Sequence, residues 1–131
     1  MKTDLGAQFR RLLVVGVALF GVLAATNPGQ AGAAPAWSGP CHAAVDRYFP
    51  AGPVAQRMHQ IVHRESRGIP TAVNRRAVGR YGRASGCAQL LPGFARPYLR
   101  AAGCSSLLEA DCNIRAARAL WNKARWSPWR T

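Results

Sequence analysis

The chain has very few acidic residues. Its 131 residues include 5 Asp and Glu against 18 Lys and Arg, which gives a formal net charge of +13. A hydrophobic fraction of 49% is too high for a disordered polycation, so length and composition predict one folded domain. The charge predicts an acidic partner, such as nucleic acid, an anionic membrane or an anionic cell-wall polymer. The alternative is that the many Arg residues reflect only genomic base composition.

The chain also lacks an apolar run long enough for a confident membrane span. The longest run, residues 12–26, has 15 residues, follows the basic residues Lys2, Arg10 and Arg11, and precedes a polar break and several small residues. This layout is typical of a secretory signal peptide, and an uncleaved membrane anchor is the alternative.

We therefore expect a signal peptide at residues 1–33 and a mature domain at residues 34–131. Cleavage after Ala33 is favoured, and cleavage after Ala36 is the alternative. Removing residues 1–33 takes away three basic residues and one acidic residue, which leaves a net charge of +11. Export predicts a secreted, extracytoplasmic protein, most naturally a monomer, without stable membrane association after cleavage. It argues against nucleic acid and leaves anionic wall polymers as the natural partner.

No two cysteines of the mature chain have the two-residue spacing of a zinc knuckle. The four residues are Cys41, Cys87, Cys104 and Cys112, and an even number in a small exported chain predicts two disulfides. Three connectivities are possible. Cys104 and Cys112 are eight residues apart and could close a short loop, which would pair Cys41 with Cys87. A metal site is the less favoured alternative, and we expect no metal and no cofactor.

The fold class predicted from hydrophobic spacing is mainly α, with a minor loop or hairpin region and two disulfides. We expect helices at residues 41–49, 53–67, 92–102 with an interruption near Pro97, and 112–123 with Asp111 as the N-terminal cap. The glycine-rich residues 71–88 predict a loop or a small hairpin.

Glu65 has an unusual place for a carboxylate. It continues the apolar face formed by Val54, Met58, Ile61 and Val62, because 11 residues from Val54 make about three helical turns. It also lies in the last turn of its helix, where the helix dipole disfavours negative charge. Burial and dipole both favour the protonated form that a general acid needs. The alternative is a structural ion pair with Arg64, Arg67 or another Arg.

Three ordered segments carry a family resemblance. Residues 63–74 contain Glu65-Ser66 followed by Gly, Pro, Ala and Asn74; residues 85–92 contain Gly86-Cys87-Ala88-Gln89; residues 111–121 contain Asn113 before an Ala-rich helix. Together they resemble the soluble lytic transglycosylase family of the lysozyme-like superfamily. The resemblance implies a small lysozyme-like domain that cleaves the MurNAc–GlcNAc β-1,4 bond of peptidoglycan strands and leaves 1,6-anhydro-MurNAc ends. A hydrolytic muramidase and a non-catalytic cationic wall-binding or antibacterial protein are the alternatives.

The resemblance also implies residue roles. Glu65 matches the single catalytic acid, and Ser66, Asn74, Gln89 and Asn113 match positions near the substrate. Within the family Ser66 corresponds to a residue that sets the local geometry next to the acid, and Gln89 to one that lines the cleft. The alternatives are an ordinary Ser at a helix end, a surface Gln and helix capping by Asn113. Two departures are Cys87-Ala88 in place of Leu-Met and Leu120-Trp121 in place of the usual Tyr.

Several aromatic and His residues leave two interpretations open. Tyr81 and Tyr98 either stack on sugar rings or pack in the core, and residues 126–129 either pack back onto the fold or line the cleft. His59 and His63 have the i, i+4 spacing of zinc-protease ligands, but Gln60 stands where the Glu base would be, so we expect surface His residues.

Overall fold

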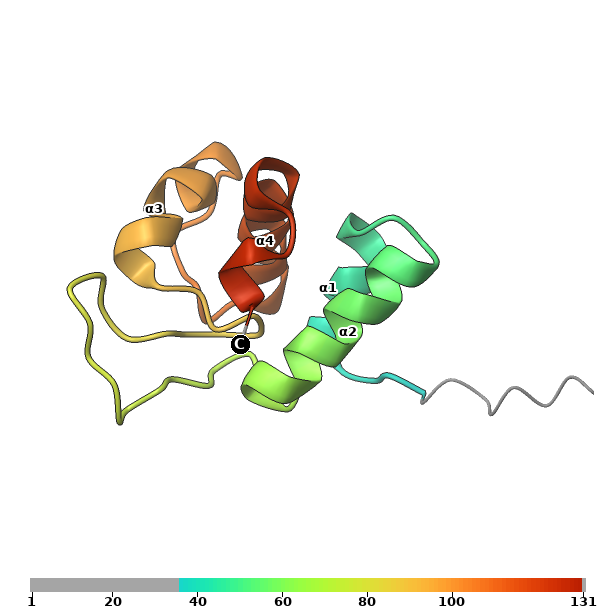
Figure 1. Cartoon of the computed structure of the whole chain (residues 1–131), viewed down its shortest axis with the longest axis horizontal. Coiled ribbons are helices and arrows are strands. Elements are labelled where there is room, and N and C mark those ends of the chain that lie inside the picture. Colours follow the sequence, from blue (N-terminus) through green and yellow to red (C-terminus); the bar gives the residue numbers. More distant parts are fainter. Residues whose placement is uncertain (1–35, 131) are drawn as a thin grey trace, which may run out of the picture. The chain divides into compact units, whose positions relative to one another are not determined.

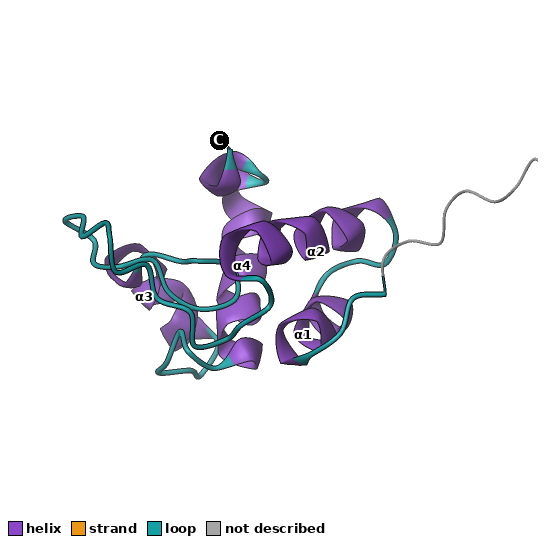
Figure 2. Cartoon of the chain, turned by 90° about the horizontal axis from the view of Figure 1, so that it is seen from below, coloured by secondary structure: helices purple, strands orange, loops and turns teal. Residues whose placement is uncertain are grey.

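The structure, a computed structural model, describes residues 36–130, so the predicted signal peptide at residues 1–33 lies outside the described residues. The elements are α1 (Pro40–Tyr48), α2 (Pro53–Ser66), α3 (Pro92–Ala101), α4 (Ala110–Ala124) and a final 3₁₀ turn, η1 (Ser127–Trp129) (Figure 1). The prediction of a mainly α fold is confirmed. Between residues 36 and 130 there is no named strand, and residues 71–91 form a loop with isolated β-bridges only (Figure 2). No helix in this part of the chain is long and apolar enough to cross a membrane.

Proline residues define where three helices begin. Pro40, Pro53 and Pro92 each stand at the start of a helix, where a missing backbone N–H costs no hydrogen bond. The α3 helix continues through Pro97, so the expected interruption is wrong. A proline at that position removes only one intrahelical hydrogen bond, and Leu99 and Ala95 of the same helix are buried.

The α4 helix is the centre of the domain and packs against both α1 and α3, while α2 packs against α1 (Figure 1). Its buried residues are Cys112, Asn113, Ile114, Ala116, Ala117, Leu120 and Trp121. The two small residues, Ala116 and Ala117, are fully buried and leave room for close packing of the neighbouring helices. Burial of side chains such as Ile114 stabilises the fold by about 1.5–3 kcal/mol each.

Two disulfides use all four cysteines, as predicted. Cys41 pairs with Cys87 and Cys104 pairs with Cys112, which is the pairing that the short loop suggested. The first bond joins α1 to the loop before α3 and spans 46 residues, whereas the second spans 8. Because loop-closure entropy increases with loop length, the chain-entropy estimate gives about 4 kcal/mol for the first bond and about 2.5 kcal/mol for the second.

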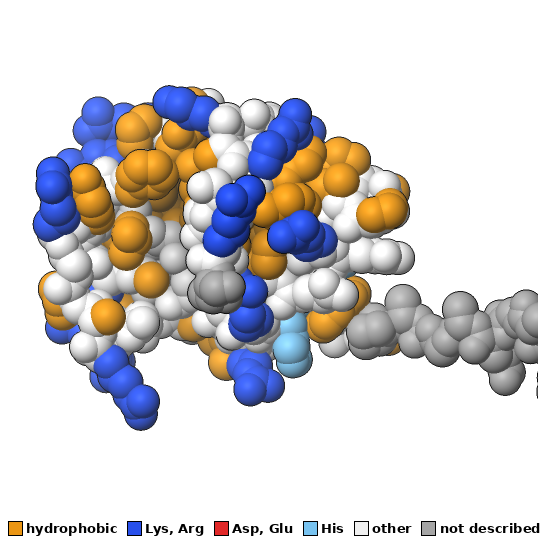
Figure 3. All heavy atoms as spheres, in the orientation of Figure 1, with side chains coloured by type: hydrophobic (Ala, Val, Ile, Leu, Met, Phe, Trp, Pro, Cys, Tyr) orange, Lys and Arg blue, Asp and Glu red, His pale blue; other side chains and the backbone are white. Residues whose placement is uncertain are grey.

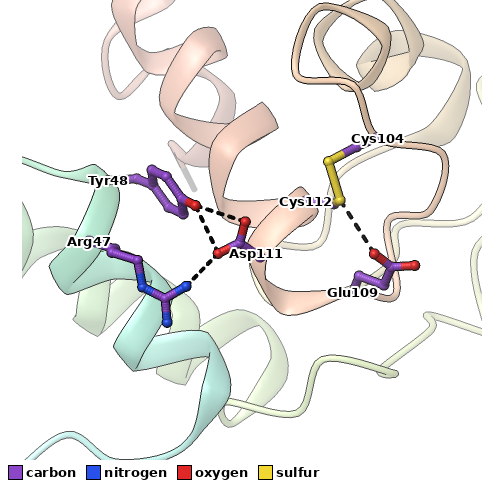
Figure 4. A network of polar contacts seen from close by, with 6 residues as sticks. All are labelled: Arg47, Tyr48, Cys104, Glu109, Asp111 and Cys112. Atoms are coloured by element: carbon purple, nitrogen blue, oxygen red, sulfur yellow. Dashed lines mark hydrogen bonds and ion pairs between the residues drawn. A yellow bond between two sulfur atoms is a disulfide. The ribbon is translucent and has the colours of Figure 1, made fainter.

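Asp111 links α4 to the end of α1 (Figure 4). Its Oδ1 accepts hydrogen bonds from Arg47 Nη1 at 2.7 Å and from the Tyr48 hydroxyl at 2.9 Å, and its Oδ2 lies 2.8 Å from the same hydroxyl. The expectation that Asp111 caps α4 is therefore wrong. The helix begins one residue earlier, at Ala110, with no side-chain cap, and the Asp111 carboxylate is occupied by these two α1 side chains. Glu109 is nearby, with Oε2 3.5 Å from the disulfide sulfur of Cys112.

All three histidines of the chain gather between α1 and α2. The Nδ1 atoms of His42 and His59 share a hydrogen bond of 2.9 Å, and His59 Nε2 is 2.9 Å from Asp46 Oδ1. Trp37, from the segment before α1, stacks on His42 and His59, with ring centroids 5.0 and 5.7 Å apart, and lies tilted against His63. The expected surface position is thus wrong for His59, which is buried, and right for His63, which is exposed.

This cluster makes stability depend on pH. Burial lowers the pKa of His42 below its ordinary 6.5; the positive charges of His59 and His63 lower it further, and Asp46 raises it in part. Because the unfolded chain then binds this proton more readily, the contribution of His42 is complete above about pH 6.5 and is lost as the pH falls toward the folded-state pKa.

We predict that the melting temperature decreases between pH 7.5 and pH 5, and that His42→Gln makes this decrease smaller. Thermal unfolding followed by circular dichroism measures both proteins across the range. A wild-type melting temperature that stays constant, or the same slope in His42→Gln, would contradict the prediction.

Candidate functional site

The tight turn at residues 85–88 is held by one buried side chain of α4. Asn113 is fully buried; its Nδ2 donates to the carbonyls of Ser85 at 3.0 Å and Leu107 at 2.9 Å, and its Oδ1 accepts from the Ala88 N–H at 2.9 Å. Gly86 has φ +79°, and a Cβ there would collide with the Leu107 carbonyl oxygen and the Asn113 amide. The turn therefore requires both the amide at position 113 and the absence of a side chain at position 86.

The implied role of Asn113 as a substrate contact needs correction. All of its hydrogen bonds go to the protein main chain and none of its surface is exposed, so its side chain cannot touch a glycan in this structure. Helix capping does not explain it either, because α4 begins at Ala110 and Asn113 lies inside its first turn. Asn113 instead positions the main chain from which Gln89 extends.

The turn also contacts the segment that follows α2. The Gly86 N–H donates to the Ala72 carbonyl at 2.7 Å, and the Asn74 N–H donates to the Ala84 carbonyl at 2.9 Å. Gln89 has a left-handed backbone, with φ 48°, and its Nε2 donates to the carbonyls of Ala72 at 3.1 Å and Gly86 at 3.0 Å. The three segments singled out in the sequence are thus joined to one another by hydrogen bonds. The Oε1 atom of Gln89 has no partner among residues 36–130.

Glu65 lies in the last turn of α2, next to buried Ser66. Its side chain is 25% exposed, and Oε1 accepts from Arg64 Nε at 3.1 Å and from Arg64 Nη2 at 2.7 Å. Of the two interpretations of Glu65, the ion pair with Arg64 is the one present in this structure. The same Nη2 donates to the Trp129 carbonyl at 2.9 Å, so the end of α2 is linked to η1.

The side chains of two further residues predicted near the substrate form hydrogen bonds with nearby main-chain groups. The Ser66 hydroxyl donates to the Val62 carbonyl at 3.0 Å and accepts from the Gly68 N–H at 3.2 Å, which shapes the end of α2. Ser66 is buried, and these bonds agree with its expected place at the helix end, where it sets the local geometry next to Glu65. Asn74 is exposed, and its Oδ1 accepts from the N–H groups of Arg76 and Ala77, which makes a local turn.

A groove of about 280 Å³ lies beside the 85–89 segment. It is lined by Ala84, Gln89, Leu90, Leu91, Phe94, Ala95, Leu120, Pro128 and Trp129. Trp129 is buried and its Nε1 donates to the Ala88 carbonyl at 3.1 Å, so the C-terminal tail both packs back onto the fold and lines this groove. The exposed Tyr81 lies edge-on to Phe94, with ring centroids 6.3 Å apart, next to the groove lining.

Sequence reasoning missed Leu91 and Phe94 as groove residues, whereas residues 126–129 were expected either to pack back onto the fold or to line the cleft. The signal for Trp129 was the aromatic character of residues 126–129, because large aromatic side chains are usually buried or used in contacts. Glu65 is not among the residues that line the groove; it is connected to it through Arg64 and the main chain of Trp129.

The residues that line the groove carry no charge, whereas the chain as a whole is strongly basic. Figure 3 shows basic side chains spread over one face, with no acidic side chain of the described residues in view. Across residues 36–130, no group of three or more His, Cys, Asp and Glu side chains could hold a metal ion. Comparison with protein families, with curated proteins and with solved structures finds no match to this chain.

We predict that Asn113→Ala lowers the free energy of unfolding by about 3 kcal/mol, because it leaves the Ser85, Leu107 and Ala88 main-chain groups buried without partners. Chemical denaturation measures the change. Lys123→Ala, an exposed α4 position, is the matched control and should change stability by less than about 0.5 kcal/mol. Equal effects of the two substitutions would show that Asn113 is not the residue that holds the turn.

Proposed function

We propose that this protein is a secreted peptidoglycan-cleaving enzyme of the lytic transglycosylase type, with a lysozyme-like fold, acting on the MurNAc–GlcNAc β-1,4 bond. The observation that carries the proposal is the set of hydrogen bonds that joins the segment after Glu65, the Gly86–Gln89 turn and Asn113 of α4. These are the three segments whose order in the sequence resembles that family. Two disulfides are compatible with an extracytoplasmic location, where the substrate lies.

Glu65 is the proposed catalytic acid. It protonates the oxygen of the glycosidic bond as that bond breaks, and the acetamido group of the substrate stabilises the cationic sugar centre. The ionised Glu65 then takes the proton of the muramyl C6 hydroxyl, whose oxygen closes the 1,6-anhydro ring. The cycle returns a protonated Glu65 and consumes no water.

The positions of the other acidic residues of the domain agree with a mechanism that uses one carboxylate. Enzymes that hydrolyse glycosidic bonds ordinarily use two carboxyl groups flanking the bond. Asp46 contacts His59, Asp111 contacts Arg47 and Tyr48, and Glu109 lies against Cys112. None of these three carboxylates hydrogen-bonds to Glu65 or Arg64 or lines the groove beside Gln89. In the free protein Oε1 of Glu65 is held by the Arg64 guanidinium. The proposal therefore requires the bound glycan to displace the Arg64 side chain, which is 47% exposed.

The groove beside Gln89 is the proposed glycan contact. Leu91, Phe94 and Trp129 offer apolar surfaces to the CH faces of a sugar ring, and Gln89 Oε1 accepts a hydrogen bond from a hydroxyl or an acetamido N–H. The positive surface would hold the protein, as a monomer, on anionic wall polymers.

The Glu65–Arg64 ion pair favours one second candidate, a non-catalytic cationic protein that binds the wall through charge and aromatic residues. Such a protein has no need of a protonated carboxyl.

We predict that Glu65→Gln remains folded and digests purified peptidoglycan at least about 10²-fold more slowly, since general acid–base catalysis is worth about 10²–10⁴-fold. Clearing of a wall suspension measures the rate, and thermal unfolding checks the fold. Glu109→Gln is the matched control, because Glu109 is exposed and precedes α4, and it should retain the wild-type rate.

Retention of more than about a tenth of the activity by Glu65→Gln, well inside that catalytic range, would rule out Glu65 as the acid. Wall binding and bacterial killing that survive in Glu65→Gln, with no turnover in the wild type, would favour the non-catalytic candidate.

A further inference from the structure

A second hollow, of about 240 Å³, lies between α1, α3 and α4. Its lining residues are Tyr48, Tyr98, Ala101, Ala102, Arg115, Arg118, Ala119 and Asn122. It shares no residue with the groove beside Gln89, and neither Glu65 nor Arg64 contributes to it. The proposed reaction therefore leaves this hollow unexplained.

One side of the hollow is a single face of α4. Arg115, Arg118 and Asn122 are spaced by three and four residues, so they stand above one another along the helix. Arg118 is held in place: its Nη1 donates to the Tyr48 carbonyl at 3.0 Å and its Nε donates to Asn122 Oδ1 at 3.0 Å. Its guanidinium carbon also lies 5.0 Å from the centre of the Trp121 ring. A prearranged guanidinium loses little conformational entropy when it binds a ligand.

The positive charge of the hollow is not neutralised by a lining carboxylate. Arg115 lies over the Tyr48 ring at 5.8 Å, and among residues 36–130 it has no hydrogen-bond or ion-pair partner. The acid one turn before it, Asp111, is bound by Tyr48 and Arg47 instead (Figure 4). Two guanidinium groups thus face a space that contains no acidic side chain of its own.

The arginine, alanine and asparagine side chains that line the hollow indicate which kind of anion it could bind. The planar guanidinium group of Arg binds carboxylates with two parallel hydrogen bonds. Ala101, Ala102 and Ala119 present small apolar surfaces that suit a methyl group. Asn122 Nδ2 has no partner within residues 36–130 and can donate to an amide carbonyl. The volume is below the roughly 300–1,000 Å³ of sites for drug-sized ligands, so only one or two small residues can enter.

From these features we infer that the hollow binds the free C-terminal carboxylate of a short peptide that ends in a small apolar residue. Arg115 and Arg118 hold the carboxylate, the alanine surfaces contact the terminal side chain, and Asn122 donates to the preceding carbonyl. This site does not depend on the proposed cleavage reaction, because it uses none of the same residues.

The test is an NMR titration of the protein with N-acetyl-alanyl-alanine, in its L and D forms, at low salt. We expect at least one form to shift the backbone amides of Ala119 and Asn122, and the same peptide with a C-terminal carboxamide to bind at least about tenfold more weakly, as loss of a charge-assisted contact implies. Arg115→Gln and Arg118→Gln should each weaken binding by about tenfold or more.

Arg76→Gln is the control, because Arg76 is an exposed residue of the 71–91 loop and does not line the hollow, so the change removes one positive charge elsewhere on the protein. Among residues 36–130 Arg115 has no hydrogen-bond or ion-pair partner to lose, so its variant should fold like the wild type. Equal binding of the carboxamide peptide, or equal weakening by Arg76→Gln, would overturn the inference and leave only a net-charge effect. Tighter binding of glycerol 3-phosphate than of either peptide would overturn the assignment to a carboxylate.

Discussion

The rest of the structure depends on the hydrogen bonds of one buried amide. Asn113 holds the 85–88 turn against α4, which is itself the helix that α1 and α3 pack upon. The same turn is fixed from two other directions, by the Cys41–Cys87 disulfide to α1 and by the indole of Trp129. The position of Gln89 and of the groove beside it follows from these three restraints. A loop without regular strands can therefore present a side chain in a fixed place.

Local sequence patterns predicted the helices, because helix formation depends mainly on residues that are close together in the chain. The spacing of apolar residues along α2 and α4, and a proline at the start of a helix, are patterns that span only a few residues. Such patterns can be recognised in the sequence alone. Asp111 was misjudged because its true partners, Arg47 and Tyr48, are more than 60 residues away. The burial of His59 was missed for the same reason, since Trp37 and His42 cover it from another element.

Some features of the candidate site could likewise be predicted from the sequence, and others could not. The place of Glu65 in the last turn of its helix followed from hydrophobic spacing, and Gln89 was singled out by the order of the motifs. The ion pair with Arg64 was one of two possibilities that spacing could not separate. The role of Asn113 could not be predicted, because a motif shows that a residue type recurs and not whether its side chain faces substrate or main chain. Trp129 became part of the groove through a contact with Ala88, 41 residues earlier in the chain.

The most direct test of peptidoglycan cleavage is mass spectrometry of what the protein releases from purified wall. We predict soluble muropeptides whose terminal sugar is lighter by one water molecule than a hydrolysed end, because the C6 hydroxyl and not water closes the reaction. Muropeptides of the hydrated mass would contradict the anhydro route and indicate a muramidase. The absence of any soluble muropeptide from wall that the protein demonstrably binds would contradict the account as a whole.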